Sequence, residues 1–114
     1  MVEIIGQFQS GFCPMVESDG WRLAFVTYGP QYGPLREMKR HMDTDEAFVL
    51  IRGNAKLYTI DGNEIKVMNM NPENVYMIRK GTWHHLYLSS DAFLIAVENC
   101  NVTADSTERM ERHY

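Results

Sequence analysis

The sequence lacks the features that would place it in or across a membrane. No apolar run approaches the roughly 18 residues that a membrane-spanning helix needs, and residues 1–6 show neither a charged leader nor the apolar core of a signal peptide. We therefore expect a cytoplasmic protein without membrane contact. A basic face is also missing, because the 11 lysines and arginines are spread among 15 acids. Nucleic acid is not an expected partner.

Cysteine and helical periodicity are scarce as well. Cys13 and Cys100 lie far apart and match no metal-binding or redox spacing, so the sequence predicts free thiols. Only residues 105–112 have a helical pattern, with Asp105 or Ser106 as the N-cap, and they predict a short C-terminal helix. A chain of 114 residues with 45% hydrophobic content can form one core and is too short for two. We expect a single domain, residues 1–114.

The sequence has instead a series of short apolar segments separated by turn residues. Their regular spacing predicts an all-β fold, an antiparallel sandwich or barrel. Residues 52–54 and 61–63 carry glycine or asparagine where tight hairpins need a positive φ, so a hairpin is predicted at each join. The predicted strands span residues 3–8, 22–28, 46–52, 55–60, 64–70, 75–78, 83–88 and 92–98.

Two of these predicted strands are apolar on both faces. In the strand that starts at Glu46, an inward glutamate leaves Val49 and Ile51 on the outer face. The strand that starts at Trp83 repeats the pattern with Tyr87. A small barrel has little material to cover its own outside, so the pattern predicts a homodimer.

A histidine and a glutamate precede the most apolar strand. The spacing is Gly33, five residues, Lys39-x-His41, four residues, Glu46, six residues and Gly53. This stretch, residues 33–53, resembles the first motif of the cupin superfamily: Gly, five residues, His-x-His, three or four residues, Glu, six residues, Gly. Lys39 stands where that family usually has its first histidine.

Residues 73–88 resemble part of the second cupin motif: Gly, five residues, Pro-x-Gly, two residues, His, three residues, Asn. Gly81 and His84 keep the family spacing. Three positions differ, because Glu73, Arg79 and Leu88 replace the first glycine, the proline and the asparagine. The resemblance implies a double-stranded β-helix, the jelly-roll barrel of the cupin type.

The same resemblance implies metal ligands at His41, Glu46 and His84, with Lys39 in the fourth place. Two histidines and one carboxylate suit non-heme iron, and also manganese, nickel or zinc, and leave coordination positions open. A protonated lysine has no lone pair to donate, and it could instead neutralise Glu46 in a metal-free cupin. A third interpretation, a donor pair of His41 and Asp43, breaks the family spacing.

A small barrel with ionisable groups inside is a pocket for a small molecule. We expect a divalent metal and a small polar ligand, anionic ones included, with isomerase, lyase or oxygenase chemistry. Lys39 is the candidate catalytic acid or base, and Arg52 and Arg79 are candidate substrate-binding cations. His85 is expected to point outward, away from His84. The alternative is a non-catalytic, metal-free cupin that binds or senses a small ligand.

Overall fold

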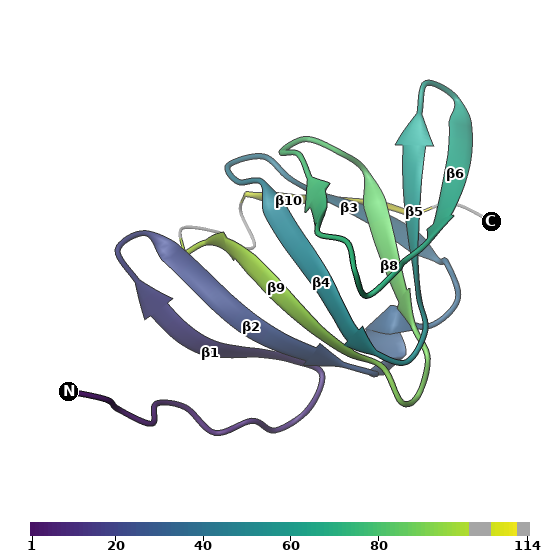
Figure 1. Cartoon of the computed structure of the whole chain (residues 1–114). Helices are drawn as coiled ribbons and strands as arrows, with labels where there is room; N and C mark the ends of the chain where they lie inside the picture. The colour runs from purple at the N-terminus through teal and green to yellow at the C-terminus, as the bar shows by residue number, and fades with distance from the viewer. Residues whose placement is uncertain (101–105, 112–114) are drawn as a thin grey trace.

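The structure is a computed structural model that describes residues 1–100 and 106–111, and it shows two antiparallel sheets packed face to face (Figure 1). Sheet A has the strand order β1-β2-β9-β4-β7, and sheet B has the order β10-β3-β8-β5-β6. Sheet A consists of β1 (Phe12–Ser18), β2 (Trp21–Thr27), β9 (Phe93–Asn99), β4 (Glu46–Arg52) and β7 (Tyr76–Ile78). Sheet B consists of β10 (Thr107–Glu111), β3 (Glu37–His41), β8 (His84–Leu88), β5 (Ala55–Asp61) and β6 (Glu64–Asn69).

This arrangement confirms the predicted all-β jelly roll. Seven of the eight predicted strands are present, with ends shifted by no more than one residue. In the described part of the chain the one helical turn is the 3-10 helix η1 (Pro30–Tyr32). None of its helices is long and apolar enough to cross a membrane.

The predicted first strand, residues 3–8, is wrong. These residues pair with no strand, and Gly6 has a φ of 79°, which interrupts an extended backbone. Phe8 instead packs edge-on against Phe25 and Phe93, with ring centroids 5.9 and 5.8 Å away. The first strand is β1, which the sequence did not predict.

The predicted C-terminal helix is also wrong, because residues 107–111 form strand β10 along the edge of β3. Cross-strand ion pairs support the pairing, with Arg40 Nη2 2.8 Å from Glu108 Oε1 and Arg109 bonded to Glu37. The open edge of β3 offers backbone groups that need partners, and this tertiary pairing overrides a weak local helical preference. Residues 105 and 112, the ends of the predicted helix, lie outside the described residues.

One of the two predicted hairpins is present. Gly62 has a φ of 63° in the turn between the paired strands β5 and β6. The other join is a corner between layers, since β4 belongs to sheet A and β5 to sheet B. Gly53, with a φ of 79°, makes this corner, and a Cβ there would lie 2.5 Å from Ala92 Cα. Only glycine lets the two backbones come this close.

Alternation along the strands places an apolar core at one end of the space between the sheets and ionisable groups at the other. Leu50 and Leu94 face each other across β4 and β9 and are at most 1% exposed. Four residues earlier on β4, Glu46 faces Glu98 in the same register and is also buried. His84, at the start of β8, brings a third buried polar group to this end.

Candidate metal centre and ligand cavity

Three donor side chains from three strands meet at this polar end. His41 ends β3, Glu46 begins β4 and His84 begins β8. Glu46 Oε1 lies 3.6 Å from His41 Nε2 and 3.8 Å from His84 Nε2. One donor atom from each residue lies within 4.8 Å of the other two. The structure therefore brings together the three residues that the cupin spacing implied.

Hydrogen bonds orient both imidazole rings. His84 Nδ1 lies 2.9 Å from the carbonyl oxygen of Thr82, and a carbonyl can only accept, so this nitrogen carries the proton. His41 Nδ1 lies 3.0 Å from Thr107 Oγ1 on β10. Both rings thus turn Nε2 toward Glu46. A partner on the second ring nitrogen is the usual way in which proteins fix a metal-binding histidine.

Hydrogen bonds to two other segments of the chain hold the loop before Glu46 in place. Thr44 is buried, and its hydroxyl accepts a hydrogen bond of 3.0 Å from the Asn99 backbone on β9. Asp45 accepts 2.8 Å and 3.1 Å hydrogen bonds from the Lys80 backbone and the Arg79 guanidinium. The contacts of Asp45 join the loop before Glu46 to the loop that contains Arg79 and Lys80. Together with the Thr44 contact, they fix the position at which β4 starts.

Burial and neighbouring charge set the protonation of the central groups. Burial lowers the pKa of His84, which favours the neutral ring that a metal ligand requires. Burial alone would raise the pKa of Glu46, but His41 and His84 outweigh it and lower that pKa. Burial, with the charge of Arg109, lowers the pKa of Lys39. The ion pairs of Glu46 run to the two histidines and not to Lys39.

A second buried carboxylate, which the sequence did not reveal, faces Glu46. Glu98 on β9 is paired in register with Glu46, and its Oε1 accepts a 2.6 Å hydrogen bond from Arg22 Nη2. Burial and the charge of Glu46 raise the pKa of Glu98. Of the two acids, Glu98 is therefore the one that takes up a proton more readily.

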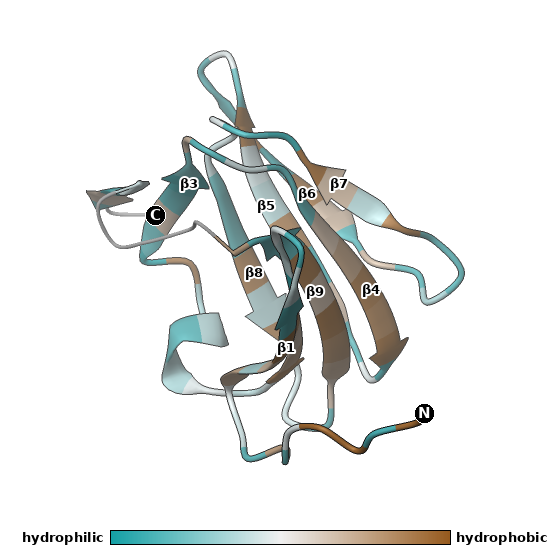
Figure 2. Cartoon of the chain, turned by 90° about the vertical axis from the view of Figure 1, so that its left-hand side faces the viewer, coloured by the Kyte–Doolittle hydropathy of each residue, from teal (hydrophilic) through white to brown (hydrophobic). Residues whose placement is uncertain are grey.

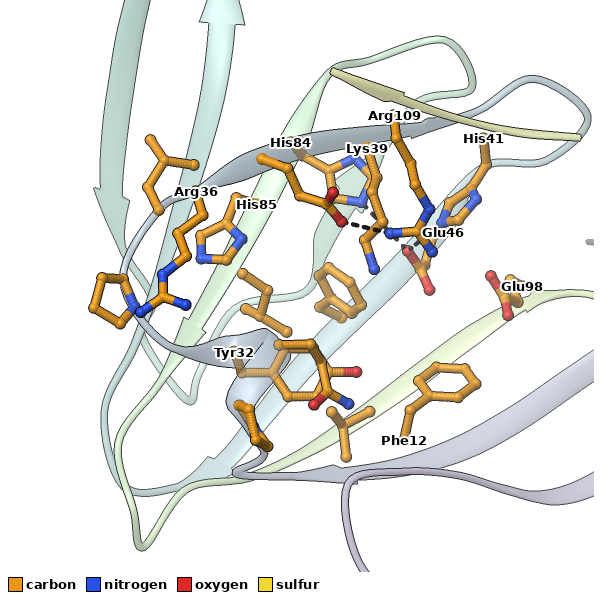
Figure 3. Close-up of a pocket in the computed structure, with 18 of the residues that line it drawn as sticks. Phe12, Tyr32, Arg36, Lys39, His41, Glu46, His84, His85, Glu98 and Arg109 are labelled. Atoms are coloured by element: carbon orange, nitrogen blue, oxygen red, sulfur yellow. Dashed lines mark hydrogen bonds and ion pairs between the residues drawn. The ribbon is translucent and has the colours of Figure 1, made fainter. Parts of the chain in front are cut away.

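These groups form one wall of a cavity of about 1270 Å³ between the two sheets (Figure 3). Lys39 points into the cavity beside Glu46, and Tyr32 lies on the opposite side (Figure 3). Burial and the charge of Glu46 raise the pKa of Tyr32, so its phenol stays protonated. The remaining walls combine cations with apolar and aromatic surface, including Phe12, Arg36, Phe48, Leu86 and Arg109.

Two of the sequence-predicted cations lie elsewhere. Arg52 follows a bulge in β4, is exposed, and stacks its guanidinium 5.2 Å from the Phe93 ring, away from the residues that line the cavity. Arg79 pairs with Asp45 and lines a smaller groove between β5, β6 and β7. Neither is positioned to bind a ligand in the main cavity.

The histidine next to His84 is buried rather than outward. His85 pairs with Tyr58 on the face of β8 opposite to His84, as strand alternation predicts, and yet it is among the residues that line the main cavity (Figure 3). Its Nε2 lies 2.8 Å from the carbonyl oxygen of Gly33, and the ring is only 6% exposed. The chain around Gly33 covers this face, which the alternation pattern alone could not indicate.

The sequence contained a signal for two of the missed residues but not for a third. Arg22 and Glu98 each lie two residues from a buried alanine on the same strand, Ala24 and Ala96. Alternation therefore places both charged side chains on the inward face. An inward charge at a strand end is a sign of a polar cavity. Arg109 carried no such signal, because its segment was predicted to be helical.

Comparison with known proteins supports the fold. No protein-family model and no curated protein matches the sequence. Streptomyces PAC13, as a variant with uridine, matches with a TM-score of 0.71 at 10% identity, over 100% of this chain and 90% of that chain. A cupin-2 domain containing protein from Shewanella frigidimarina matches with a TM-score of 0.60 at 19% identity, over 81% and 82%.

A third match is QdtA, a sugar 3,4-ketoisomerase from Thermoanaerobacterium thermosaccharolyticum in complex with TDP. Its TM-score is 0.64 at 13% identity, over 76% of this chain and 64% of that chain. A further structure describes Pac13 as a nucleoside dehydratase. The chain has the fold of a small cupin domain, and the neighbours of that fold include sugar and nucleoside enzymes.

Proposed function

We propose that this cupin holds a divalent metal at His41, Glu46 and His84 and acts on a small anionic molecule in the adjoining cavity. The reaction class is isomerisation, elimination or oxygenation. The cytoplasmic location expected from the sequence is part of the proposal, and the two free thiols, Cys13 and Cys100, agree with it.

The arrangement of the three donors carries this proposal. A transition metal lies about 2.1 Å from a histidine nitrogen or a carboxylate oxygen, so its ligand atoms lie roughly 3 to 3.5 Å from one another. The donors here lie within 4.8 Å of one another, and small side-chain rotations would close the difference. Both Nδ1 atoms already have partners, which leaves both Nε2 atoms for the metal. The donor set therefore fits iron, manganese, nickel or zinc.

The character of the cavity supports an anionic ligand. Lys39, Arg36 and Arg109 line it, and Arg22 Nε is a buried donor without an acceptor among the described residues. Phosphate or carboxylate oxygens would satisfy such donors. Two of the fold neighbours, PAC13 with uridine and QdtA with TDP, hold nucleoside or nucleotide ligands, and the cavity is large enough for molecules of that size. Nucleoside phosphates and nucleotide sugars are therefore the first ligand class to test.

The surrounding residues can provide proton transfer. Bound metal would supply Lewis-acid polarisation of a ligand oxygen. Lys39, with its lowered pKa, can act as a base, and Glu98, with its raised pKa, can act as an acid. Paired acid and base groups on one cavity wall are what isomerisation and elimination require. Tyr32 can donate its phenolic hydrogen to a ligand on the other side.

The test is metal analysis of the purified protein by mass spectrometry, followed by calorimetric titration of the metal-free protein with iron(II), manganese, nickel and zinc. We expect one metal per chain in the wild type, and a loss of affinity of at least about 100-fold in His41→Ala and His84→Ala. His85→Gln is the matched control, since it removes a neighbouring imidazole on the other strand face and should keep the metal. Stoichiometric metal in a folded His41→Ala, His84→Ala double variant would contradict the proposal.

The metal-free alternative has its own supporting observation. Buried Glu46 and Glu98, with half-buried Lys39, form an acid–base set that does not depend on an ion. In that case no metal binds tightly to the wild type, and nucleotide binding by calorimetry stays unchanged after treatment with a chelator. Ligand binding that disappears on chelation and returns with metal excludes the alternative.

A further inference from the structure

The two histidines of the donor set differ in the partner of the second ring nitrogen. His84 Nδ1 lies 2.9 Å from the carbonyl oxygen of Thr82, and a carbonyl can only accept. The neutral His84 ring is therefore fixed with its proton on Nδ1 and a lone pair on Nε2. His41 Nδ1 lies 3.0 Å from the hydroxyl of Thr107, and a hydroxyl can donate as well as accept. The neutral His41 ring can thus take either tautomer and keep this hydrogen bond.

Glu46 determines which tautomer His41 adopts in the metal-free protein. Its Oε1 lies 3.6 Å from His41 Nε2. A carboxylate favours a proton on the nitrogen that faces it, because a lone pair there would repel its negative charge. His84 cannot offer a proton from Nε2, since the Thr82 carbonyl holds its proton on Nδ1. The metal-free arrangement therefore has the His41 proton on Nε2, and Thr107 donates to Nδ1.

A metal ligand needs the opposite tautomer of His41. Nε2 is the nitrogen that faces Glu46, and it binds a cation only through its lone pair, so the proton must then be on Nδ1. In that state the Thr107 hydroxyl rotates and accepts a hydrogen bond from Nδ1. The neutral ring carries one proton before and after, and the His41 side chain is 15% exposed, so exchange with solvent can relocate the proton.

Strand β10 holds the Thr107 hydroxyl in this position. Thr107 is directly opposite His41 in the pair of β3 and β10, so both side chains lie on one face. Beside them, the backbone N–H of Met42 donates a 3.0 Å hydrogen bond to the carbonyl oxygen of Ser106. β3 is mostly hydrophilic, unlike β4 and β9 (Figure 2), and cross-strand ion pairs add to the backbone pairing. Long-range strand pairing therefore supplies the second partner of the His41 ring.

We infer that Thr107 is a positioning residue of the metal site, whose hydroxyl reverses its hydrogen bond to His41 when a metal binds. It donates to Nδ1 in the metal-free protein and accepts from Nδ1 in the metal-bound protein. His84 needs no such change, so His41 is the ligand whose tautomer limits how tightly the metal is held. The inference rests on the metal site proposed above.

The first test is nitrogen NMR of the histidine rings at about pH 8.5, well above the ordinary pKa of histidine. Long-range proton–nitrogen correlation identifies the ring nitrogen that carries the proton. Zinc is the probe, because it is diamagnetic and the donor set fits it. We expect His41 to carry its proton on Nε2 without zinc and on Nδ1 with zinc. His84 should carry its proton on Nδ1 in both states.

The second test is the zinc dissociation constant, measured by calorimetry. Thr107→Val removes the hydroxyl but keeps a β-branched side chain that suits a strand, and it should raise the constant at least about tenfold. Thr107→Ser keeps the hydroxyl and should retain the wild-type affinity. Thr59→Val is the matched control, because Thr59 is directly opposite His84, whose ring is hydrogen-bonded to Thr82. This control should leave the affinity unchanged.

Glu108→Gln separates the role of the hydroxyl from the docking of β10. This variant removes the 2.8 Å ion pair between Glu108 and Arg40 and keeps Thr107. Its zinc affinity should equal that of the wild type. If circular dichroism shows that Thr107→Val is unfolded, Thr107→Ala takes its place with the same expectation.

Two kinds of result would overturn the inference and leave the proposed metal site intact. One is a wild-type protein that binds zinc while His41 keeps the same tautomer throughout. The other is an affinity that Thr107→Val does not change, or that Glu108→Gln lowers to the same extent. A wild-type protein that binds none of the four metals would instead contradict the proposed function, and the inference with it.

Discussion

Glu98 on β9 lies directly opposite Glu46 on β4, and both carboxylates are buried, at 6% and 4% exposed. Like charges in adjacent positions destabilise a sheet unless something offsets them. Arg22 neutralises Glu98 from one side, and the two histidines face Glu46 from the other. The pair therefore divides the cavity wall into a donor site around Glu46 and an acidic group at Glu98.

Replacing Glu98 tests this division. Glu98→Gln leaves the buried guanidinium of Arg22 with only Glu17, 3.5 Å away, as a counter-ion. We expect the free energy of unfolding in urea to fall by about 1–3 kcal/mol. Glu17→Gln is the matched control, because this carboxylate is 54% exposed and should cost less than about 0.5 kcal/mol. An equal loss of unfolding free energy in the two variants would show that Glu98 stabilises the fold no more than the exposed Glu17 does.

Lys39 should weaken metal binding, because its ammonium group lies in the same cavity as the three donors. Lys39→Met removes the positive charge at similar volume, and we expect calorimetry to show metal affinity that is tighter by about tenfold or more. Lys39→His should tighten binding further by supplying the fourth ligand of the cupin motif. Lys66→Met, which removes an exposed lysine paired with Asp61, should leave the affinity unchanged.

The opposite result for Lys39 has a definite meaning. If neither the wild type nor these variants binds metal, and Lys39→Ala lowers the free energy of unfolding by roughly 3–5 kcal/mol, the lysine compensates the buried carboxylates. The metal-free cupin would then be the correct interpretation.

Acid should destabilise the metal-free protein through two histidines. Burial lowers the pKa of His84 and of His85 below the ordinary value of 6.5. Between each lowered pKa and 6.5 the unfolded chain binds a proton that the folded chain does not, so the free energy of unfolding falls as the pH falls. The slope reaches at most about 1.4 kcal/mol per pH unit for each histidine.

Urea unfolding at several pH values between 4.5 and 7.5 (roughly the window in which such groups titrate), with chelator present, measures this effect. His84→Gln and His85→Gln should each flatten the profile. A wild-type profile that is level below pH 6.5, or one that neither substitution alters, would contradict the assignment.

The corner at Gly53 should tolerate no side chain. A Cβ there would meet the backbone of Ala92 at 2.5 Å, in addition to the strain of a φ of 79°. We expect Gly53→Ala to lower the free energy of unfolding by more than about 2 kcal/mol. Gly62→Ala is the control, because it has a similar positive φ with nothing within 4 Å, and should cost about 1 kcal/mol. Thermal denaturation separates the two, and equal losses would rule out the close approach as the cause.

The sequence predicted the elements that local patterns determine. Alternation located β4 to the residue, and the cupin spacing selected His41, Glu46 and His84, which the structure brings together. Their role as metal ligands stays a prediction. The jelly roll followed from the same resemblance and is confirmed by the two packed sheets and by the cupin neighbours.

Long-range pairing determined what the sequence could not show. Residues 107–111 are a strand because the edge of β3, more than 60 residues earlier in the chain, needs a partner. Residues 3–8 have a strand-like pattern but find no free edge in their own chain. His85 is buried because the distant chain around Gly33 covers it. None of these contacts leaves a signal in the local sequence.

The candidate donors do not belong to one layer of the fold. His41 and His84 project from sheet B, whereas Glu46 projects from sheet A. An ion bound by all three residues would cross-link the two sheets. The sheets could then separate only after the ion had dissociated. Amide hydrogens of β3, β4 and β8 would then exchange with solvent at a common rate, slowed together by the ion. Amide hydrogen exchange at backbone positions far from any donor atom would thereby report whether an ion is bound.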